Sequence, residues 1–334
     1  MKKTCVLVTG AAGEIGHNLI ERLKQPILAL DIVKPHQTLP SHVDFRQGSV
    51  TDKEFIKSLG DEFSFSAIIH LAGVLSSGSE EDPFHAHDLN VNGSLNMLHL
   101  AHSQAQAENR SPVFVFASTI AVYSINPPFD KFSAGKINEE QFLNPVSMYG
   151  MNKLYVERLG QYFSTTIRTN TGSRVDFRAL RFPGILSAET VPTTGTSDYG
   201  PLMLHAAAKG EAYSCFVPED ATLNFMVMPD AVEALVGISG ADAAALTRRV
   251  YNVTSFSVTA AEIKSQVLKA FPQAEISFDP VSWRTNLISS WPMDTDDSAA
   301  RSDWGWIPRF NREQSFQDYL VPGVRRKYGL GLDH

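Results

Sequence analysis

The chain is poor in cysteine, in positive charge and in long hydrophobic runs, and each shortage excludes a class of protein. It has two cysteines in 334 residues, Cys5 and Cys215, so we expect free thiols rather than a disulfide framework. The net charge of -7 disfavours nucleic acid as a partner, because phosphate binding needs a basic surface. No apolar run reaches the roughly 18 residues of a membrane span. With a strand pattern starting too near the N-terminus for a targeting peptide, these features predict a cytoplasmic protein.

Metal-binding patterns are also missing, although the chain has ten histidines. His85 and His87 are two residues apart, and His99 and His102 are three apart. No H-E-x-x-H or C-x-x-C pattern accompanies them. We therefore predict no metal site and interpret these histidines as surface or capping residues.

A glycine-rich turn is the first feature that indicates a function. The apolar run 4–9 predicts a buried strand, and a helix is predicted over 17–24. Between them lies a G-x-x-G-x-x-G pattern, whose glycines permit a tight turn, close approach to a pyrophosphate and close helix packing. The helix N-terminus offers free N–H groups to phosphates. The predicted cofactor-binding residues of this turn are Gly10, Gly13, Glu14, Ile15 and Gly16.

An acidic residue follows at the position that a dinucleotide site requires. Asp31 closes the second apolar run, 27–30, about 20 residues after the first glycine. A carboxylate there accepts hydrogen bonds from the adenosine ribose and repels a 2′-phosphate, so we predict NAD rather than NADP. Lys34 is the one nearby residue that favours NADP.

Small and hydroxyl-bearing residues end the later strands of the predicted sheet. Strands are predicted over 43–49, 66–71 and 112–117. Ala72 and Gly73 follow one of them and leave room for a cofactor. Ser118 and Thr119 follow another and are suited to orienting a substrate alcohol or carbonyl. A turn cap is the alternative role for one of these two hydroxyls.

Tyr149 and Lys153 form the candidate catalytic pair. Four residues apart on a helix, they lie on one face, where the ammonium would favour the phenolate. Such a phenolate could take a proton from an alcohol. Because the spacing is short and common, an ordinary surface Tyr and Lys is the alternative for the pair taken alone.

The order of these motifs resembles that of the extended short-chain dehydrogenase/reductases. The motifs that carry the resemblance are the glycine turn, Asp31, His70-Leu-Ala-Gly73, Asn90-Val-Asn-Gly93, Ser118-Thr119 and Tyr149 with Lys153. The resemblance implies an NAD enzyme of the α/β class. Its fold would be a Rossmann-type doubly wound parallel sheet with a smaller, discontinuous C-terminal substrate domain. The further cofactor-binding residues that it implies are Leu71, Ala72, Gly73, Asn90, Tyr149, Lys153, Pro183 and Ile185.

The second half is similar to one branch, the short-chain-type L-threonine 3-dehydrogenases. The similar segments are Arg181-Phe-Pro-Gly-Ile-Leu-Ser187, Gly195-Thr-Ser-Asp-Tyr199, Met226-Val-Met-Pro-Asp-Ala231 and Ser290-Trp-Pro292. The branch implies NAD-dependent oxidation of the L-threonine 3-hydroxyl to 2-amino-3-oxobutyrate, with Tyr149 as base, assisted by Lys153, Thr119 and Ser118. The implied substrate-binding residues are Ser76, Thr119, Tyr149, Gly184, Thr196 and Trp291. Arg181 is a further candidate for the substrate carboxylate.

The predicted organisation has two lobes. Residues 1–182, joined by 226–255, form the NAD-binding domain, and 183–225 with 256–310 form the substrate lobe, followed by a C-terminal helix and tail at 311–334. In the second half we expect a strand at 175–182, a capping box from Thr259 to Glu262 and a helix over 294–304. The hydroxyl-rich loop 187–200 is a candidate lid over the nicotinamide.

Three alternatives stay open, and one assembly is expected. A nucleotide-sugar epimerase, another hydroxy-acid dehydrogenase and a non-catalytic NAD-sensing module share the same fold expectations. The family resemblance implies a homodimer that pairs through helices over 88–107 and 148–163.

Overall fold

The computed structural model describes residues 2–35, 38–127, 129–167, 169–192 and 195–331. Within these residues the largest element is a parallel sheet of seven strands in the order β11-β7-β5-β4-β1-β2-β3. The strands are β1 (Lys3–Thr9), β2 (Ile27–Asp31), β3 (Val43–Gln47), β4 (Phe63–His70), β5 (Val113–Thr119), β7 (Asp176–Phe182) and β11 (Val250–Asn252). The strand order reverses between β1 and β4, which is where sheets of this kind bind ligands.

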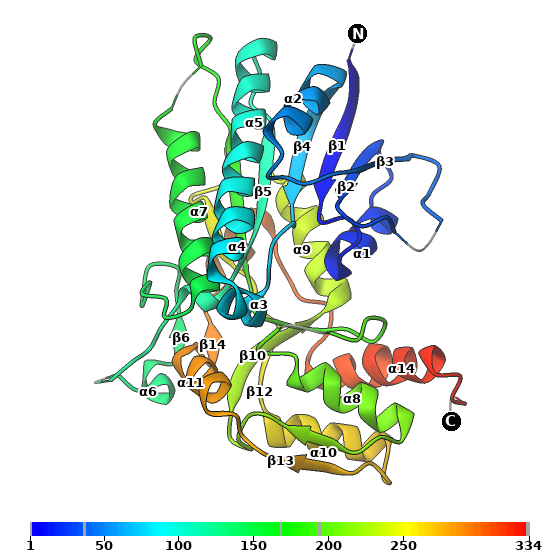
Figure 1. Cartoon of the computed structure of the whole chain (residues 1–334). Coiled ribbons are helices and arrows are strands. Elements are labelled where there is room, and N and C mark those ends of the chain that lie inside the picture. Colours follow the sequence, from blue (N-terminus) through cyan, green and yellow to red (C-terminus); the bar gives the residue numbers. More distant parts are fainter. Residues whose placement is uncertain (1, 36–37, 128, 168, 193–194, 332–334) are drawn as a thin grey trace.

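Helices cover both faces of this sheet, as Figure 1 shows. One face carries α1 (Glu14–Arg22) and α9 (Met228–Gly240), and the other carries α2 (Lys53–Glu62), α5 (Ser94–Glu108) and α7 (Met148–Thr165). A sheet covered on both faces needs strands that are apolar on both sides, and β1 is buried from Cys5 to Thr9. The predicted Rossmann-type doubly wound fold is confirmed.

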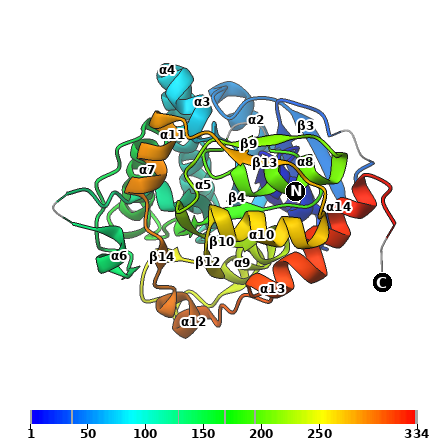
Figure 2. The ribbon, with the colours of Figure 1, turned by 90° about the horizontal axis from the view of Figure 1, so that it is seen from below.

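A smaller lobe lies beyond the carboxyl ends of the large sheet (Figures 1 and 2). Its main sheet has the order β12-β10-β8, and β9 pairs with β13. The strands are β8 (Gly184–Leu186), β9 (Tyr213–Cys215), β10 (Thr222–Val227), β12 (Phe256–Thr259) and β13 (Ile276–Phe278). Its helices are α8 (Tyr199–Lys209), α10 (Ala260–Ala270), α11 (Ser282–Ser290) and α14 (Val321–Lys327). Because β10 runs directly into α9, the chain returns from this lobe to the large sheet.

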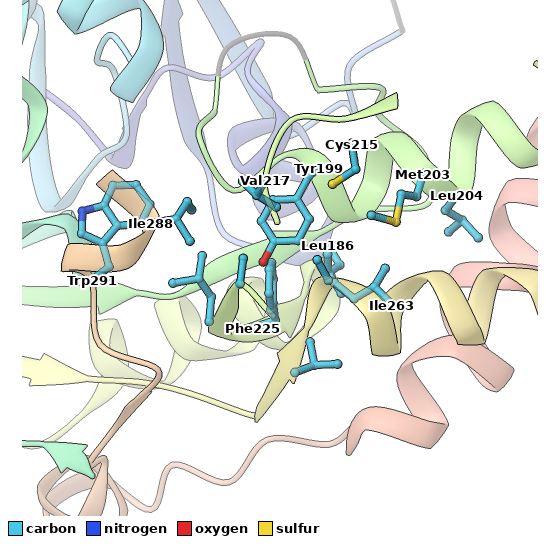
Figure 3. Packing of buried hydrophobic residues seen from close by; sticks show 14 of the residues in the cluster. Leu186, Tyr199, Met203, Leu204, Cys215, Val217, Phe225, Ile263, Ile288 and Trp291 are labelled. Atoms are coloured by element: carbon cyan, nitrogen blue, oxygen red, sulfur yellow. The ribbon is translucent and has the colours of Figure 1, made fainter. Parts of the chain in front are cut away.

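The smaller lobe has its own hydrophobic core, drawn in Figure 3. Tyr199 stands edge-on to Phe225 with ring centroids 5.9 Å apart, and Ile263 of α10 belongs to the same cluster. Trp291, at the end of α11, is buried at the side of this core. The residue therefore joins the packing of the lobe to the cavity described below.

Short elements complete the chain. They are α3 (Ser76–Glu81), α4 (Pro83–His87), η1 (Asp88–Gly93), η2 (Ile120–Val122), α6 (Lys131–Ala134), β6 (Lys136–Ile137), β14 (Asp294–Thr295), α12 (Ser298–Trp304), α13 (Arg312–Gln314) and η3 (Ser315–Leu320). The free cysteines, Cys5 and Cys215, are both buried. Across the part of the chain that the structure describes, no helix has the length and apolar character to cross a membrane. The same residues contain no His, Cys, Asp and Glu grouping suited to a metal.

Two predicted helices begin elsewhere than expected. The helix predicted over 17–24 begins at Glu14, so that residue belongs to the first turn. The helix predicted over 294–304 begins at Ser298, because residues 294–295 pair with β6 instead. The Asp297 carboxylate binds Arg301 and the Trp306 indole N–H, so it does not cap the helix. The predicted Thr259 to Glu262 capping box is confirmed.

The domain boundaries stay a prediction. Residues 1–182 with 226–255 contribute the large sheet, and 183–225 with 256–310 contribute most of the smaller lobe. Of the tail at 311–334, the structure describes residues up to 331.

Candidate active site

A cavity of about 390 Å³ opens at the carboxyl ends of the central strands, with walls from both lobes. The predicted site residues that line it are Gly10, Gly13, Glu14, Ile15, Gly16, Asp31, Leu71, Ala72, Gly73, Ser76, Ser118, Thr119, Tyr149, Lys153, Pro183, Gly184, Ile185 and Trp291. Asn90 and Thr196 do not line it but bond to residues that do. Most of the residues predicted from the sequence therefore lie around one cavity. Their roles stay predictions.

The glycine turn lies between β1 and α1, and its three glycines line the cavity without side chains. Gly10 has a φ of +67°, and a Cβ there would lie 2.7 Å from the Ala72 nitrogen. A Cβ on Gly16 would lie 2.2 Å from the Gly10 carbonyl oxygen, so only glycine lets α1 approach this closely. The N-terminus of α1 therefore meets the cavity at short range and can bind a diphosphate.

Asp31 ends β2 at the cavity wall. Its Oδ2 accepts a hydrogen bond of 2.9 Å from the Ala12 N–H, and its Oδ1 accepts one of 3.0 Å from the Val33 N–H. Each carboxylate oxygen keeps a second lone-pair direction for ribose hydroxyls. The glycine cradle and this carboxylate therefore fit the adenosine and diphosphate parts of NAD.

Asn90 holds the backbone that follows β4. Its Oδ1 accepts from the Val74 N–H at 2.8 Å, and its Nδ2 donates to the Val74 carbonyl oxygen at 3.1 Å. Its side chain also lies over Gly73, where a Cβ would come within 2.8 Å of Oδ1. Asn90 therefore positions the strand end instead of facing the cavity itself.

Tyr149 and Lys153 lie on α7, one turn apart and within the cavity wall. The Thr119 hydroxyl hydrogen-bonds the Tyr149 phenol, but burial outweighs this bond and raises the Tyr149 pKa well above its ordinary value. The pKa of the phenol is therefore raised in the cavity, not lowered as expected. A buried phenol keeps its proton unless nearby positive charge outweighs the cost of burying the phenolate, so the help that the Lys153 ammonium gives stays a prediction.

Lys153 is held by a backbone carbonyl and an aromatic ring. Its Nζ donates to the Ala117 carbonyl oxygen at 2.8 Å and lies 4.6 Å from the Phe116 ring centroid. Burial lowers its pKa to about 8, and the charge of Glu157 opposes that shift. At neutral pH the side chain is therefore mostly an ammonium, although its charge is easily lost.

Ser118 lines the cavity beside Thr119. Its hydroxyl donates to the Glu157 carboxylate at 2.5 Å, so its oxygen can meet a ligand only as an acceptor. The Thr119 oxygen accepts a hydrogen bond from the Ala121 N–H at 3.1 Å. That these two hydroxyls orient the substrate stays a prediction.

Arg181 does not line the cavity in which it was a candidate for the substrate carboxylate. Its guanidinium forms a bidentate pair with Glu157 at 2.9 and 2.6 Å and donates to the Tyr123 hydroxyl at 2.8 Å. Its side chain is 2% exposed. A carboxylate clamp needs a donor that faces the ligand, and this one is fully engaged beneath the sheet edge.

Ser76 and Thr196 meet each other. The Thr196 N–H and hydroxyl both donate to the Ser76 oxygen at 2.9 Å, and both residues are buried. With its oxygen occupied as acceptor, the Ser76 hydroxyl proton remains free for a ligand. The contact closes the loop 187–200 over α3, with residues 193–194 of that predicted lid outside the described residues.

Residues 6–254 match the family described as NAD dependent epimerase/dehydratase. The chain belongs to this family. An uncharacterized epimerase/dehydratase of Staphylococcus saprophyticus is 31% identical over 93% of both chains. L-threonine dehydrogenase from Phytophthora infestans is similar with a TM-score of 0.83 and 33% identity, covering 95% of this chain and 98% of that one. A monomeric L-threonine 3-dehydrogenase from a metagenome is similar with a TM-score of 0.84 and 29% identity, covering 96% of this chain and 99% of that one.

The family match confirms the predicted cofactor, NAD, and places the chain among NAD-dependent oxidoreductases of the epimerase/dehydrogenase type. Structural neighbours also confirm the resemblance to L-threonine 3-dehydrogenases at the level of the fold.

Two candidate functional residues of this chain were not predicted from the sequence. Asp198 lines the cavity from the loop before α8, where its Oδ2 accepts from the Gly195 N–H at 2.5 Å. Glu157 lies on α7, the helix that carries Tyr149 and Lys153. Its position four residues after Lys153 and eight after Tyr149 was a signal available in the sequence, because that spacing keeps one helix face.

Glu14 introduces an acidic group where a diphosphate would bind. Burial raises its pKa to about 7, a hydrogen bond from Ser187 opposes the shift, and the charge of Asp198 adds to it. Since a raised carboxyl pKa means that the proton is held below pH 7 and lost above it, the carboxylate that forms repels the phosphates. We expect NAD affinity to fall roughly tenfold from pH 6 to pH 8.5.

A Glu14→Gln variant removes this charge, so its NAD dissociation constant should stay level over the same pH range. Direct titration of NAD by calorimetry measures both proteins. Glu21→Gln, on the exposed side of α1, is the matched control and should keep the wild-type slope. A wild-type NAD dissociation constant that does not change with pH would contradict the repulsion assigned to Glu14.

Proposed function

We propose that this protein is an NAD-dependent L-threonine 3-dehydrogenase. The observation that carries the proposal is the contact between the Tyr149 phenol and the Thr119 hydroxyl at the wall of a cavity that holds Lys153. The fold of its neighbours supports the choice, since two solved L-threonine dehydrogenases cover nearly the whole chain.

The residues divide the chemistry between them. Thr119 orients the substrate 3-hydroxyl against Tyr149, which takes the hydroxyl proton as phenolate. Lys153 holds its ammonium nearby and favours the phenolate as the proton moves. NAD, when bound, supplies the hydride acceptor for the substrate's third carbon.

Two groups are available for the amino acid's own polar atoms. Ser76 has a free hydroxyl proton at the cavity wall, as described above. The Trp291 indole N–H is buried without a hydrogen-bond partner among the described residues, and the residue lines the cavity. Because an unpaired buried donor is costly, we assign both to the substrate carboxylate.

The charge of the cavity disfavours a nucleotide sugar as the substrate. Among its described lining residues, Lys153 is the sole Lys or Arg, whereas Glu14, Asp31 and Asp198 are acidic. A nucleotide sugar brings two more phosphates in addition to those of the cofactor, and they would need cationic partners. A small zwitterion needs none.

A substrate panel tests the proposal. The purified protein is mixed with NAD and, separately, L-threonine, L-serine, simple 2- and 3-hydroxy acids and UDP-sugars, and absorbance of NADH is followed. We expect reduction with L-threonine at the highest kcat/KM. Faster turnover of a hydroxy acid, or epimerisation of a UDP-sugar without NADH release, would replace the assignment. No turnover of any alcohol would favour the NAD-sensing module.

We also propose a homodimer that forms through α5 and α7. These neighbouring helices expose apolar side chains on one side, namely Leu95, Met151, Tyr155 and Tyr162. Burying such a surface is favourable, although one relative is described as monomeric. Light scattering should give twice the chain mass, and Tyr155→Glu should give the monomer. A monomeric wild type would contradict the proposal.

A further inference from the structure

Glu157 is buried one helical turn beyond Lys153, on the face of α7 that carries the catalytic pair. Its side chain is 1% exposed. Oε1 accepts from the Ser118 hydroxyl at 2.5 Å and from Arg181 Nε at 2.9 Å, while Oε2 accepts from Arg181 Nη2 at 2.6 Å. Every contact fixes the carboxylate at the underside of the strand ends that form the cavity.

Arg181 anchors this carboxylate from β7, where it pairs in register with Ser118 of β5. Its remaining donors reach the Tyr123 hydroxyl at 2.8 Å and the Glu139 carbonyl oxygen at 2.7 Å. Glu139 is itself paired with Arg248, at 2.6 Å. The charges therefore alternate in sign from Lys153 through Glu157, Arg181 and Glu139 to Arg248, whose side chain is 38% exposed.

We propose that Glu157 is a positioning residue that keeps Lys153 protonated in the dry cavity and holds Ser118 at the strand end. Arg181 locks the carboxylate in place. This inference rests on the proposed function in one respect, because the proposed function gives Lys153 its catalytic task. The effect of the Glu157 charge on Lys153 does not depend on any substrate.

The groups around Lys153 make Glu157 the decisive charge. Tyr149 on the same helix is neutral, because burial raises its pKa. His70 of β4 is also neutral, because burial and, to a smaller extent, the charge of Lys153 together lower its pKa to about 3. Arg181 is a cation, so it cannot support a second positive charge. Glu157 is thus the anion that supports the Lys153 ammonium, whose pKa burial lowers to about 8.

The signs of the charges provide the test. Removing the anion with Glu157→Gln leaves Arg181 unpaired and should lower the Lys153 titration midpoint by about one pH unit or more, a tenfold change in its ammonium-to-amine ratio. Removing the cation with Arg181→Met takes away a repulsion and should leave that midpoint in place or raise it. Both variants break the same buried ion pair. If Glu157 had a purely structural role, both variants would therefore shift the Lys153 titration midpoint in the same way.

The midpoint is read without cofactor or substrate. Lysine labelled with 13C at the ε-carbon is incorporated, and the NMR shifts are followed from pH 6 to pH 10. The Lys153 signal is the one missing from Lys153→Met. Because the titration contains no L-threonine, it can fail or succeed independently of the proposed function.

A fall of the midpoint in Glu157→Gln that is absent in Arg181→Met supports the inference. An unchanged midpoint in Glu157→Gln, or an equal fall in both variants, overturns it. If Glu157→Gln does not fold, the double variant Glu157→Leu/Arg181→Met replaces the pair by apolar residues of similar volume. Its midpoint must then fall, because the charge of Glu157, one turn along α7, supports the Lys153 ammonium. An unchanged value again overturns the inference.

Discussion

Tyr149→Phe will slow L-threonine oxidation by about 10²–10⁴-fold, the range that one general base contributes. The substitution removes one oxygen, the atom that bonds Thr119 and would take the substrate proton. Nothing in the glycine turn or at Asp31 changes. NAD affinity should therefore weaken by at most about tenfold, as for one lost hydrogen bond.

The pH profile of the wild type adds a second signature to this variant. Burial raises the Tyr149 pKa, so the phenolate is scarce at neutral pH. Since turnover needs the phenolate, the rate should rise with pH in the wild type. The residual rate of Tyr149→Phe should lack that rise.

Tyr155→Phe is the matched control for this loss of activity. It lies on the same helix, at the proposed dimer surface and outside the cavity lining, and phenylalanine keeps its apolar ring there. Steady-state assays with NADH detection and fluorescence titration of NAD separate turnover from binding. A Tyr149→Phe protein with wild-type kcat would remove the assigned base.

Gly16→Ala will weaken NAD binding by about 100-fold or more, corresponding to roughly 2.8 kcal/mol. The new Cβ would lie 2.2 Å from the Gly10 carbonyl oxygen and 2.8 Å from the Ala11 Cα, both backbone atoms that no rotamer change can move. The N-terminus of α1 must therefore shift away from the cavity. Overpacking of this kind also destabilises the fold, by about 1–3 kcal/mol.

Gly240→Ala controls for the general effect of alanine at a helical glycine. Gly240 ends α9, and a Cβ there meets no atom within 4 Å. Alanine favours helix over glycine, so the melting temperature should stay level or rise. Calorimetric NAD titration and thermal melts compare the two variants. Equal NAD affinity in Gly16→Ala and wild type would contradict the close approach of α1.

Backbone-determined features were predictable from the sequence. Gly10 has the left-handed φ that favours glycine, and a Cβ on Gly16 would clash with the backbone of the turn. Asp31 follows at a fixed distance along the strand-turn-helix unit. The spacing of Tyr149 and Lys153 needs only helix geometry. Such local rules locate the cofactor site because each motif follows the carboxyl end of a strand, and in a parallel sheet these ends lie along the same edge.

Side-chain partners that meet only in the folded chain were not predictable in the same way. Ser118 and Arg181 come from neighbouring strands, and both bond Glu157 of α7. A sequence shows the presence of the hydroxyl and the guanidinium but not which of them is already engaged. The direction of the Tyr149 pKa was missed for the same reason, since burial is set by the whole surrounding structure.

The transfer of the hydrogen on the third carbon of L-threonine is the most direct test of the proposed activity. The protein is mixed with NAD and L-threonine deuterated at that carbon, and the reduced cofactor is analysed by mass spectrometry. The account predicts that the nicotinamide gains one deuterium, with 2-amino-3-oxobutyrate as the other product. Recovery of L-threonine that keeps its deuterium, together with unreduced NAD, under conditions where both bind would contradict it.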